Sequence, residues 1–357
     1  MNITIVGAGN VGTQIAVHAA EKGNKVLMYT DPNRINKELK IIDEKNNITN
    51  KGIISLATLD EEIAFSNSDV IFVTYPAFKM EEIANKIYPY ANKNMKICLV
   101  PGTGGGEWEF KKCIEKGATL FGLQRVPSVA RIIKKGDTVK AIGYRKELKI
   151  ASIPKSKSNE CKEIIESIFE IDCKVLPNYL NITLTPSNPI LHTTRLKTIF
   201  NDYYEGKTYD KIPLFYEEWN NESSKLLLKC DEELQCICKN INLDLSEVIS
   251  LKEHYESDDE IELTNKIRSI IGFKGLETPN KMLENGFVPD LNSRYFTADF
   301  PYGLSILVQI ANLTNTNVPY MKDTLEWYKN IVKENNEYDF KKYGVTSINK
   351  LINFYKI

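Results

Sequence analysis

Short apolar runs alternate with helical stretches in the first part of the chain. Residues 2–6 form a β-branched run, residues 14–22 place small apolar side chains at helical spacing, and residues 25–29 form a second run. Gly23 is expected to end the helix before the second strand begins. This alternation of strand and helix predicts a parallel sheet.

Two continuous apolar runs, at residues 69–74 and 95–100, are typical of parallel strands that are buried on both faces. Residues 80–90 between them predict a crossover helix. Further strands are expected at residues 118–123, 139–144, 148–153 and 173–176, with a helix at residues 160–169. These elements predict an α/β domain over residues 1–180.

Helical periodicity dominates the second half of the chain. One helix of about seven turns is predicted from apolar residues at three- and four-residue steps, which we interpret as a core-facing stripe. Its members are Phe215, Trp219, Leu226, Cys230, Leu234, Ile237 and Ile241. Further helices are expected at residues 246–255, 259–271, 302–313 and 323–334. Because the third of these is apolar nearly all round, it should be a buried central helix. An all-α C-terminal domain is therefore predicted over residues 181–357.

Length and charge narrow the function classes. A chain of 357 residues exceeds what one hydrophobic core usually organises, so two domains are expected. The formal net charge of −1 leaves no electrostatic footprint for nucleic acid or an anionic membrane, which favours a small-molecule partner. The first predicted strand leaves no room for a signal peptide, and no apolar stretch reaches the ~20 residues of a spanning helix. A cytoplasmic location is expected.

Metal binding is not predicted. Of seven scattered cysteines only Cys230, Cys236 and Cys238 cluster, and their spacing on a helix does not aim three thiolates at one point. We interpret them as small buried apolar residues. The three histidines are far apart in the sequence and form no ligand pair.

A glycine motif joins the first strand to the first helix. Gly7 permits a tight turn, Gly9 lets backbone approach a pyrophosphate, and Gly12 lets the helix pack close to the sheet. The phosphates would lie at the positive end of the helix, beside the intervening residues Ala8, Asn10 and Val11. The alternative is a turn whose glycines serve packing only. The position of the motif between strand and helix favours a Rossmann-type dinucleotide-binding domain.

The choice between NAD and NADP depends on two residues after the second strand. Asp31 follows Gly12 by nineteen residues, near the position where a carboxylate accepts hydrogen bonds from the adenosine ribose. A carboxylate there would repel a 2'-phosphate and favours NAD, whereas Arg34 could pair with that phosphate and favours NADP. Arg34 could equally be a solvated loop cation. The balance favours NAD.

Loops at the carboxyl ends of parallel strands are where ligands bind in such sheets. The strand at residues 69–74 leads to Pro76, and the strand at residues 95–100 leads to Gly102. Four glycines in residues 101–106, before a helix that begins at Glu107, indicate backbone close to a ligand rather than a merely flexible loop. Pro76 and Gly102 are therefore candidate cofactor contacts.

Two segments of the second half carry candidate chemistry. His192 ends the sequence NPILH, and Arg294 and Asp299 lie in RYFTADFPYGL, directly before the predicted buried helix. Each residue also has a structural interpretation. His192 could be a satisfied core or surface side chain, Asp299 could cap the helix that Pro301 begins, and Arg294 could pair with Asp299.

These segments, taken with the first domain, resemble the octopine/nopaline-type opine dehydrogenases. The matching pieces follow the order of that family over nearly the whole chain: GAGNVG at 7–12, PGTGGGEWEF at 101–110, VPSVAR ending at Arg131, NPILH at 188–192, FYEEWNNESSKLLLKCDEE at 215–233 and RYFTADFPYGL at 294–304. The NPxxH and DxPxGL pieces are more specific than the glycine motif. Two departures leave the substrate open: Ala298, where the family often has an acid, and a loose match before Arg131.

The resemblance implies an NAD(P)H-dependent condensation of a 2-oxo acid, pyruvate or 2-oxoglutarate, with the amino group of an amino acid through an imine. It places the catalytic histidine at His192, its aspartate partner at Asp299 and the arginine for the oxo acid carboxylate at Arg294. An imidazole can accept and return the protons of this chemistry, and a guanidinium can bind a carboxylate with two parallel hydrogen bonds.

Other functions share the same plan. A ketopantoate-reductase-like or 3-hydroxyacid dehydrogenase would reduce an oxo acid without an amine, and a dinucleotide-binding sensor would do no chemistry. The sequence leaves open the amino acid, the oxo acid, the direction of reaction and whether the chain forms a homodimer. Aromatic candidates for the pocket wall, each better explained as a core residue, are Tyr203, Trp219, Tyr295 and Tyr302.

Overall fold

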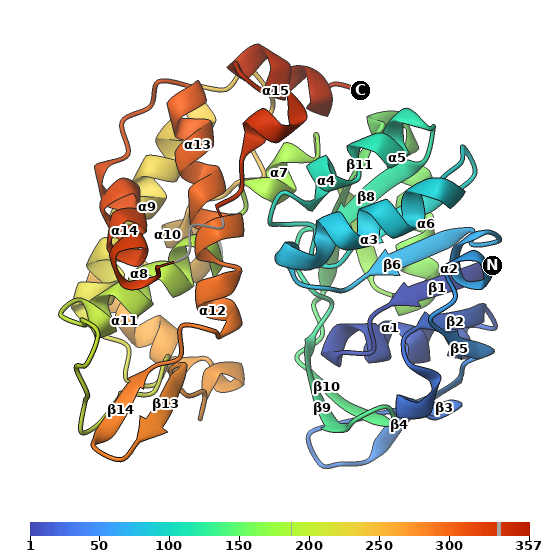
Figure 1. The fold of residues 1–357 in the computed structure, drawn as a ribbon, viewed down its shortest axis with the longest axis horizontal. Coiled ribbons are helices and arrows are strands. Elements are labelled where there is room, and N and C mark those ends of the chain that lie inside the picture. Colours follow the sequence, from blue (N-terminus) through green and yellow to red (C-terminus); the bar gives the residue numbers. More distant parts are fainter. Residues whose placement is uncertain (187, 334–336) are drawn as a thin grey trace. The chain divides into compact units, whose positions relative to one another are not determined.

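The computed structural model describes residues 1–186, 188–333 and 337–357. The chain divides into two compact units, one made of Met1–Thr183 with Phe354–Ile357 and the other of Leu184–Asn353. Figure 1 shows the sheet of the first unit in blue to green and the helices of the second unit in yellow-green to red.

The first unit contains, within the described residues, an eight-stranded sheet of order β12-β11-β8-β7-β6-β1-β2-β5. Neighbouring strands are parallel except β11 and β8. The strands are β1 (Asn2–Val6), β2 (Lys25–Tyr29), β5 (Leu56–Thr58), β6 (Val70–Val73), β7 (Lys96–Leu99), β8 (Thr119–Leu123), β11 (Glu147–Ile153) and β12 (Asp172–Val175). The order reverses beside β1, which is the point where ligands bind in sheets of this class. The predicted α/β class of this half is confirmed.

A smaller four-stranded sheet of order β4-β3-β10-β9 was not predicted as such. Its strands are β3 (Glu38–Ile42), β4 (Ile48–Ile53), β9 (Val129–Lys134) and β10 (Thr138–Ile142). Only β10 was predicted, and it ends at Ile142 rather than at residue 144. Each of the other strands carries a lysine and partly or fully exposed residues, so they lack the continuous apolar run of a doubly buried strand.

Helices α1 and α6 share one hydrophobic core with the strands. Ile15 and Val17 of α1 and Ile165 of α6 belong to the same buried cluster as Phe72 of β6 and Ile41 of the small sheet. The helices of this unit are α1 (Asn10–Glu21), α2 (Glu61–Phe65), α3 (Met80–Ile87), α4 (Gly106–Glu109), α5 (Lys111–Glu115), α6 (Ser158–Phe169) and α7 (Leu180–Thr183).

The second unit is mainly helical. Its helices are α8 (Asn188–Phe200), α9 (Asn221–Lys239), α10 (Leu251–Tyr255), α11 (Glu260–Ser269), α12 (Arg294–Thr297), α13 (Ser305–Leu313), α14 (Pro319–Ile331) and α15 (Ile348–Tyr355), the end of which belongs to the first unit. The unit also contains a hairpin, β13 (Asn280–Leu283) with β14 (Gly286–Pro289), that the helical periodicity did not predict.

The predicted seven-turn helix is too long. Helix α9 begins at Asn221, because the Asn220 side chain accepts a hydrogen bond from the Ser223 N–H and caps it. Phe215 and Trp219 are buried, but they lie in the non-helical segment before this cap. Because the spacing of buried apolar residues continues before Asn221, it does not show where α9 begins.

Other predicted boundaries also shift. The helix at residues 246–255 is reduced to α10, which Ser250 caps. The buried helix at residues 302–313 begins as a π-helical turn, Phe300–Leu304, and continues as α13. The helix predicted to end at residue 334 is α14, and that end lies outside the described residues.

The prediction that the clustered cysteines are buried is wrong for Cys236, which is exposed, and Cys238 is partly exposed. Cys230 is buried as predicted. Among the described residues, no helix combines the length and the apolar character that crossing a bilayer requires.

Candidate active site

His192 lies in the first turns of α8, where Asn188 and Pro189 begin the helix. The following residues Thr193 and Thr194 satisfy their own hydroxyls by donating to the carbonyls of Pro189 and Ile190, at 2.7 and 2.6 Å. His192 is only 5% exposed, so its polar ring nitrogens require partners from other elements.

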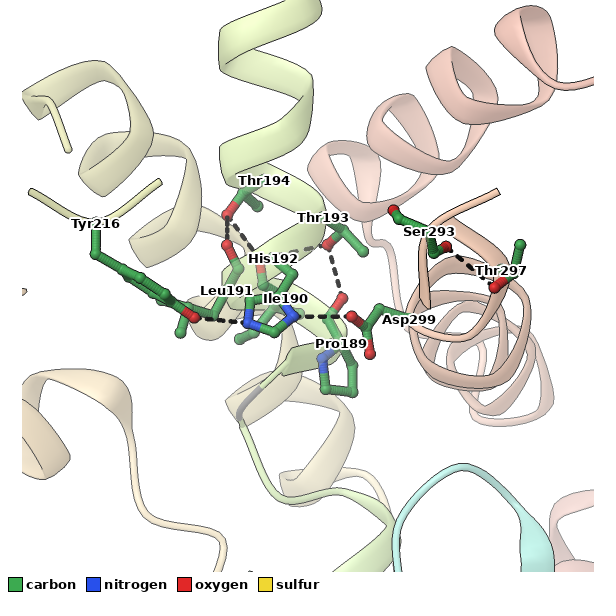
Figure 2. A network of polar contacts seen from close by, with 10 residues as sticks. All are labelled: Pro189, Ile190, Leu191, His192, Thr193, Thr194, Tyr216, Ser293, Thr297 and Asp299. Atoms are coloured by element: carbon green, nitrogen blue, oxygen red, sulfur yellow. Dashed lines mark hydrogen bonds and ion pairs between the residues drawn. The ribbon is translucent and has the colours of Figure 1, made fainter. Parts of the chain in front are cut away.

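Both ring nitrogens of His192 have such partners (Figure 2). Nδ1 lies 2.8 Å from Asp299 Oδ2, and Nε2 lies 2.7 Å from the Tyr216 hydroxyl. An ionised carboxylate only accepts hydrogen bonds, so Nδ1 carries the proton that it donates to Asp299. In the neutral ring Nε2 is then an acceptor, and the Tyr216 O–H donates to it. The contact fixes the tautomer in which Nε2 is the base.

Asp299 is not a helix cap. It has helical backbone angles and its side chain makes no capping hydrogen bond, while one carboxylate oxygen binds His192. The π-helical turn that follows brings Gly303 against Pro189, where an added Cβ would lie 3.0 Å from the proline Cβ. A glycine at this position therefore allows the segment carrying Asp299 to pack beside the start of α8.

Arg294 is exposed at the start of α12. Among the described residues no hydrogen bond or ion pair engages its side chain, so the alternative pairing with Asp299 is not observed. The next residue, Tyr295, stacks on the His192 ring with centroids 4.2 Å apart. The structure thus brings His192 and Asp299 into contact and leaves the Arg294 guanidinium available for a ligand.

Arg195 anchors the segment that carries Tyr216, a role that the sequence analysis missed. Its buried guanidinium donates to the carbonyls of Phe215, Leu214 and Glu218 at 3.0, 3.3 and 2.7 Å. Burial lowers the pKa of Arg195 to about 10. A cavity of about 610 Å³ lies beside Arg195, and neither His192 nor Asp299 lines it.

The glycine motif of the first unit fits a dinucleotide. Gly7 has φ +105°, a conformation that favours glycine, and a Cβ on Gly12 would lie 1.9 Å from the Gly7 carbonyl oxygen. A Cβ on Gly9 would meet nothing within 4 Å. Gly7 and Gly12 are therefore required by the turn itself, whereas the open space at Gly9 can receive a pyrophosphate beside the first turn of α1.

The two residues that bear on cofactor choice are bound to each other. Arg34 Nε lies 3.1 Å from Asp31 Oδ2, and the other carboxylate oxygen of Asp31 accepts a hydrogen bond from Asn33 N–H at 3.0 Å. The Arg34 side chain is also largely exposed, so it is a solvated loop cation that pairs with Asp31. Its guanidinium neutralises the carboxylate that follows β2.

The remaining predicted cofactor contacts occupy two strand-end loops. Pro76 precedes a 3₁₀ turn after β6. Gly102 follows β7, and its carbonyl accepts a hydrogen bond from the Tyr179 hydroxyl at 3.1 Å. A Cβ on Gly102 would lie 2.7 Å from that hydroxyl, so close packing accounts for this glycine.

Glu107 is a buried carboxyl at the end of the same glycine-rich segment, and no pattern in the sequence indicates its role. The hydroxyls of Thr183 and Tyr355 donate to its Oε1 at 2.5 and 2.7 Å. Burial is the main cause that raises the pKa of Glu107 to about 7, against the lowering effect of these hydrogen bonds. Tyr355 is near the end of the chain, so no local pattern could have predicted this contact.

Comparison with known proteins agrees with this arrangement. Residues 175–332 match the alpha-helical domain of NAD/NADP octopine/nopaline dehydrogenase, and residues 3–132 match ketopantoate reductase PanE/ApbA. The opine dehydrogenase of Arthrobacter sp. (strain 1C) is 27% identical over 96% of this chain and 92% of its own length. Together these matches support the octopine/nopaline-type opine dehydrogenase family for this chain. Another relative, the tauropine dehydrogenase of Arabella iricolor, is 25% identical over 92% of this chain and 91% of its own.

A solved structure within this opine dehydrogenase family has the same fold. It is octopine dehydrogenase with NADH and L-arginine, 22% identical to this chain, with a TM-score of 0.85 over 98% of this chain and 97% of its own. The likeness supports the predicted order of a Rossmann-type domain followed by a helical domain.

Proposed function

We propose that this protein is an opine dehydrogenase, an NAD(P)H-dependent oxidoreductase that condenses a 2-oxo acid with the amino group of an amino acid and reduces the resulting imine. The observation that supports this most is the buried His192, held by the Asp299 carboxylate with Nε2 as the base. Such chemistry needs a group that takes a proton from an ammonium and returns it to a departing hydroxyl.

Three side chains divide the work on the substrates. His192 takes the proton that makes the amine nucleophilic and returns one when water leaves the carbinolamine. Asp299 orients the imidazole and faces the charge that forms on it. Arg294 binds the carboxylate of the 2-oxo acid, since its guanidinium has two parallel donors and no competing partner among the described residues.

The cofactor is a nicotinamide dinucleotide, which supplies the hydride when bound. We assign its pyrophosphate to residues 7–12 and the first turn of α1, with Pro76 and Gly102 at the neighbouring strand ends. The Asp31 carboxylate would accept from the adenosine ribose, which favours NAD over NADP. Arg34, which could bind a 2'-phosphate, is paired with Asp31. The ratio of kcat/KM with NADH to kcat/KM with NADPH measures which cofactor the enzyme prefers.

The proposed domain roles follow from the two sets of residues. Residues 1–180 would bind the dinucleotide, and residues 181–357 would bind the oxo acid and the amino acid. We infer that the enzyme is cytoplasmic, acts on small-molecule substrates, and binds neither nucleic acid nor a membrane. A homodimer is the assembly to test, by light scattering of the purified protein.

A substrate panel tests the function. The protein is incubated with NADH or NADPH, with pyruvate or 2-oxoglutarate, and with each amino acid in turn. We expect loss of reduced-cofactor absorbance that requires both the oxo acid and the amine. No amine-dependent loss across the panel would contradict the proposal.

The match of residues 3–132 to ketopantoate reductase favours one alternative, a dehydrogenase that reduces an oxo acid alone. The same panel separates the two functions. Oxidation of the reduced cofactor by oxo acid without amine, at the same rate as with amine, would support the alternative.

A further inference from the structure

A line of hydroxyl groups continues from the candidate base. Tyr216 donates to His192 Nε2 at 2.7 Å, and Tyr295 stacks on the same imidazole with ring centroids 4.2 Å apart. Burial and, after it, the neighbouring Tyr295 raise the pKa of Tyr216. Nε2 therefore has no free lone pair for a substrate while Tyr216 remains in place. Any proton that reaches or leaves His192 at Nε2 must pass through the Tyr216 hydroxyl, or Tyr216 must move away.

The packing of Tyr216 opposes such a movement. Its ring stacks on Phe273, with centroids 4.0 Å apart and an angle of 16° between the ring planes. It also lies nearly parallel to the Trp219 ring, with centroids 6.3 Å apart. The side chain is 4% exposed, and Arg195 holds the backbone on both sides of it. A ring fixed in this way is suited to passing a proton without changing its position.

Tyr295 lies at the outer end of the line. It is partly exposed, its ring stacks on His192, and it directly follows Arg294 in α12. The hydroxyl line thus runs from a buried base to a tyrosine next to the exposed arginine that we assign to the oxo acid carboxylate.

We propose that His192 exchanges its proton with the substrates through the hydroxyls of Tyr216 and Tyr295, so that His192, Tyr216 and Tyr295 form one proton relay whose inner end Asp299 orients. In this relay Tyr295 contacts the substrate and Tyr216 connects it to His192. The proposal rests on the proposed opine dehydrogenase function.

The proton balance of the relay is complete. The substrate ammonium gives a proton to the Tyr295 oxygen as Tyr295 gives its own to Tyr216 and Tyr216 gives its own to His192 Nε2. The free amine then forms a C–N bond with the oxo carbon as the C=O π bond opens, and the proton that the new ammonium loses passes to the alkoxide to give the neutral carbinolamine. The same protons move in reverse to the carbinolamine hydroxyl, the C–O bond breaks and water leaves. The hydride reduces the C=N bond to the secondary amine, and the cofactor is oxidised.

Single and double substitutions test the relay in the full chain. Tyr216→Phe and Tyr295→Phe keep the stacked rings and remove one hydroxyl each. We expect each to lower kcat by about 10²-fold, as for the loss of general acid–base catalysis, and to raise the solvent deuterium isotope effect on kcat. The double variant should be no slower than the slower single variant, because both hydroxyls serve one step.

Tyr209→Phe is the matched control. Its hydroxyl binds Asp202 at 2.9 Å in the same unit, so this variant also loses one tyrosine hydrogen bond while the His192 contacts stay intact. We expect its kcat to stay within about twofold of the unsubstituted protein. A Tyr216→Phe variant with unchanged or higher kcat would overturn the relay and indicate that Tyr216 only covers Nε2.

Failure of the relay and failure of the function give different results. A wild-type protein without amine-dependent cofactor oxidation contradicts the function, whereas an active wild type with an unaffected Tyr216→Phe variant contradicts only the relay. If Tyr216→Phe does not fold, the solvent isotope effect of the wild type in mixtures of H₂O and D₂O decides. A curved dependence on deuterium content indicates several protons in motion, and a linear one contradicts the relay.

Discussion

At the scale of single residues, the proposed chemistry depends on an imidazole that is bound at both nitrogens. We expect His192→Gln to lower kcat by about 10²- to 10⁴-fold, because glutamine cannot take and return a proton. NADH affinity should stay unchanged, because the glycine motif lies in the other compact unit. Steady-state rates and a fluorescence titration with NADH measure both effects. Full turnover by this variant would remove His192 from the mechanism.

The role assigned to Arg294 predicts how its substitution changes KM for the 2-oxo acid. Arg294→Lys keeps the charge but loses the paired donors, so KM for the 2-oxo acid should rise by about 10- to 10²-fold. The melting temperature should not change, because the side chain is exposed and has no partner among the described residues. KM for the oxo acid, at saturating amine and NADH, is the measurement. An unchanged KM would mean that another group holds the carboxylate.

At the scale of elements, the turn from β1 to α1 separates packing from binding. Gly12→Ala should destabilise the protein by about 1 to 3 kcal/mol, because its Cβ would overlap the Gly7 carbonyl. Gly9→Ala should leave the urea midpoint nearly unchanged, since its Cβ meets nothing within 4 Å, yet raise KM for NADH at least about tenfold. If the two variants changed the urea midpoint by the same amount and KM for NADH by the same factor, packing at Gly12 and cofactor binding at Gly9 would not be separate roles.

The segment that carries Glu107 makes the stability depend on pH. Below about pH 4.5 the carboxyl is protonated in both states, whereas between about 4.5 and 7 only the unfolded chain ionises, because the folded pKa is raised to about 7. Stability contributed by this group is therefore lost as pH rises. The full loss is on the order of 3 kcal/mol above pH 7.

Glu107→Gln cannot ionise and should reduce this decline. Urea unfolding at pH 5 and pH 8 measures it, with the exposed Glu44→Gln as the control. We expect the difference in unfolding free energy between the two pH values to be smaller in Glu107→Gln than in Glu44→Gln. An equal difference in both would show that Glu107 ionises at its ordinary pH in the folded protein.

Element boundaries show where sequence patterns stop being informative. The strand at Lys25–Tyr29 was predicted residue for residue, because Gly23 and a continuous apolar run define it. The predicted helix includes residues before Asn220, which caps the real one, because buried residues at four-residue spacing continue in the non-helical segment before Asn220. Periodicity reports burial, and burial is not confined to helices.

At the scale of the whole molecule, the sequence predicted the two-part plan but only part of the candidate site. The family resemblance predicts that His192 and Asp299 act as partners, and His192 Nδ1 lies 2.8 Å from Asp299 Oδ2. Tyr216, Arg195 and Glu107 were not identified, because their roles depend on contacts between segments that are distant along the chain. A pattern read along one chain cannot show which buried hydroxyl meets which nitrogen.

The proposed reaction is tested most directly by following the hydride. NADH deuterated at the transferred position is incubated with pyruvate or 2-oxoglutarate and the amino acid that gives the highest rate, and the products are analysed by mass spectrometry. We expect a secondary amine dicarboxylate with one deuterium at the former carbonyl carbon. Deuterium found instead in a 2-hydroxy acid, with no secondary amine formed, would contradict the proposed reaction.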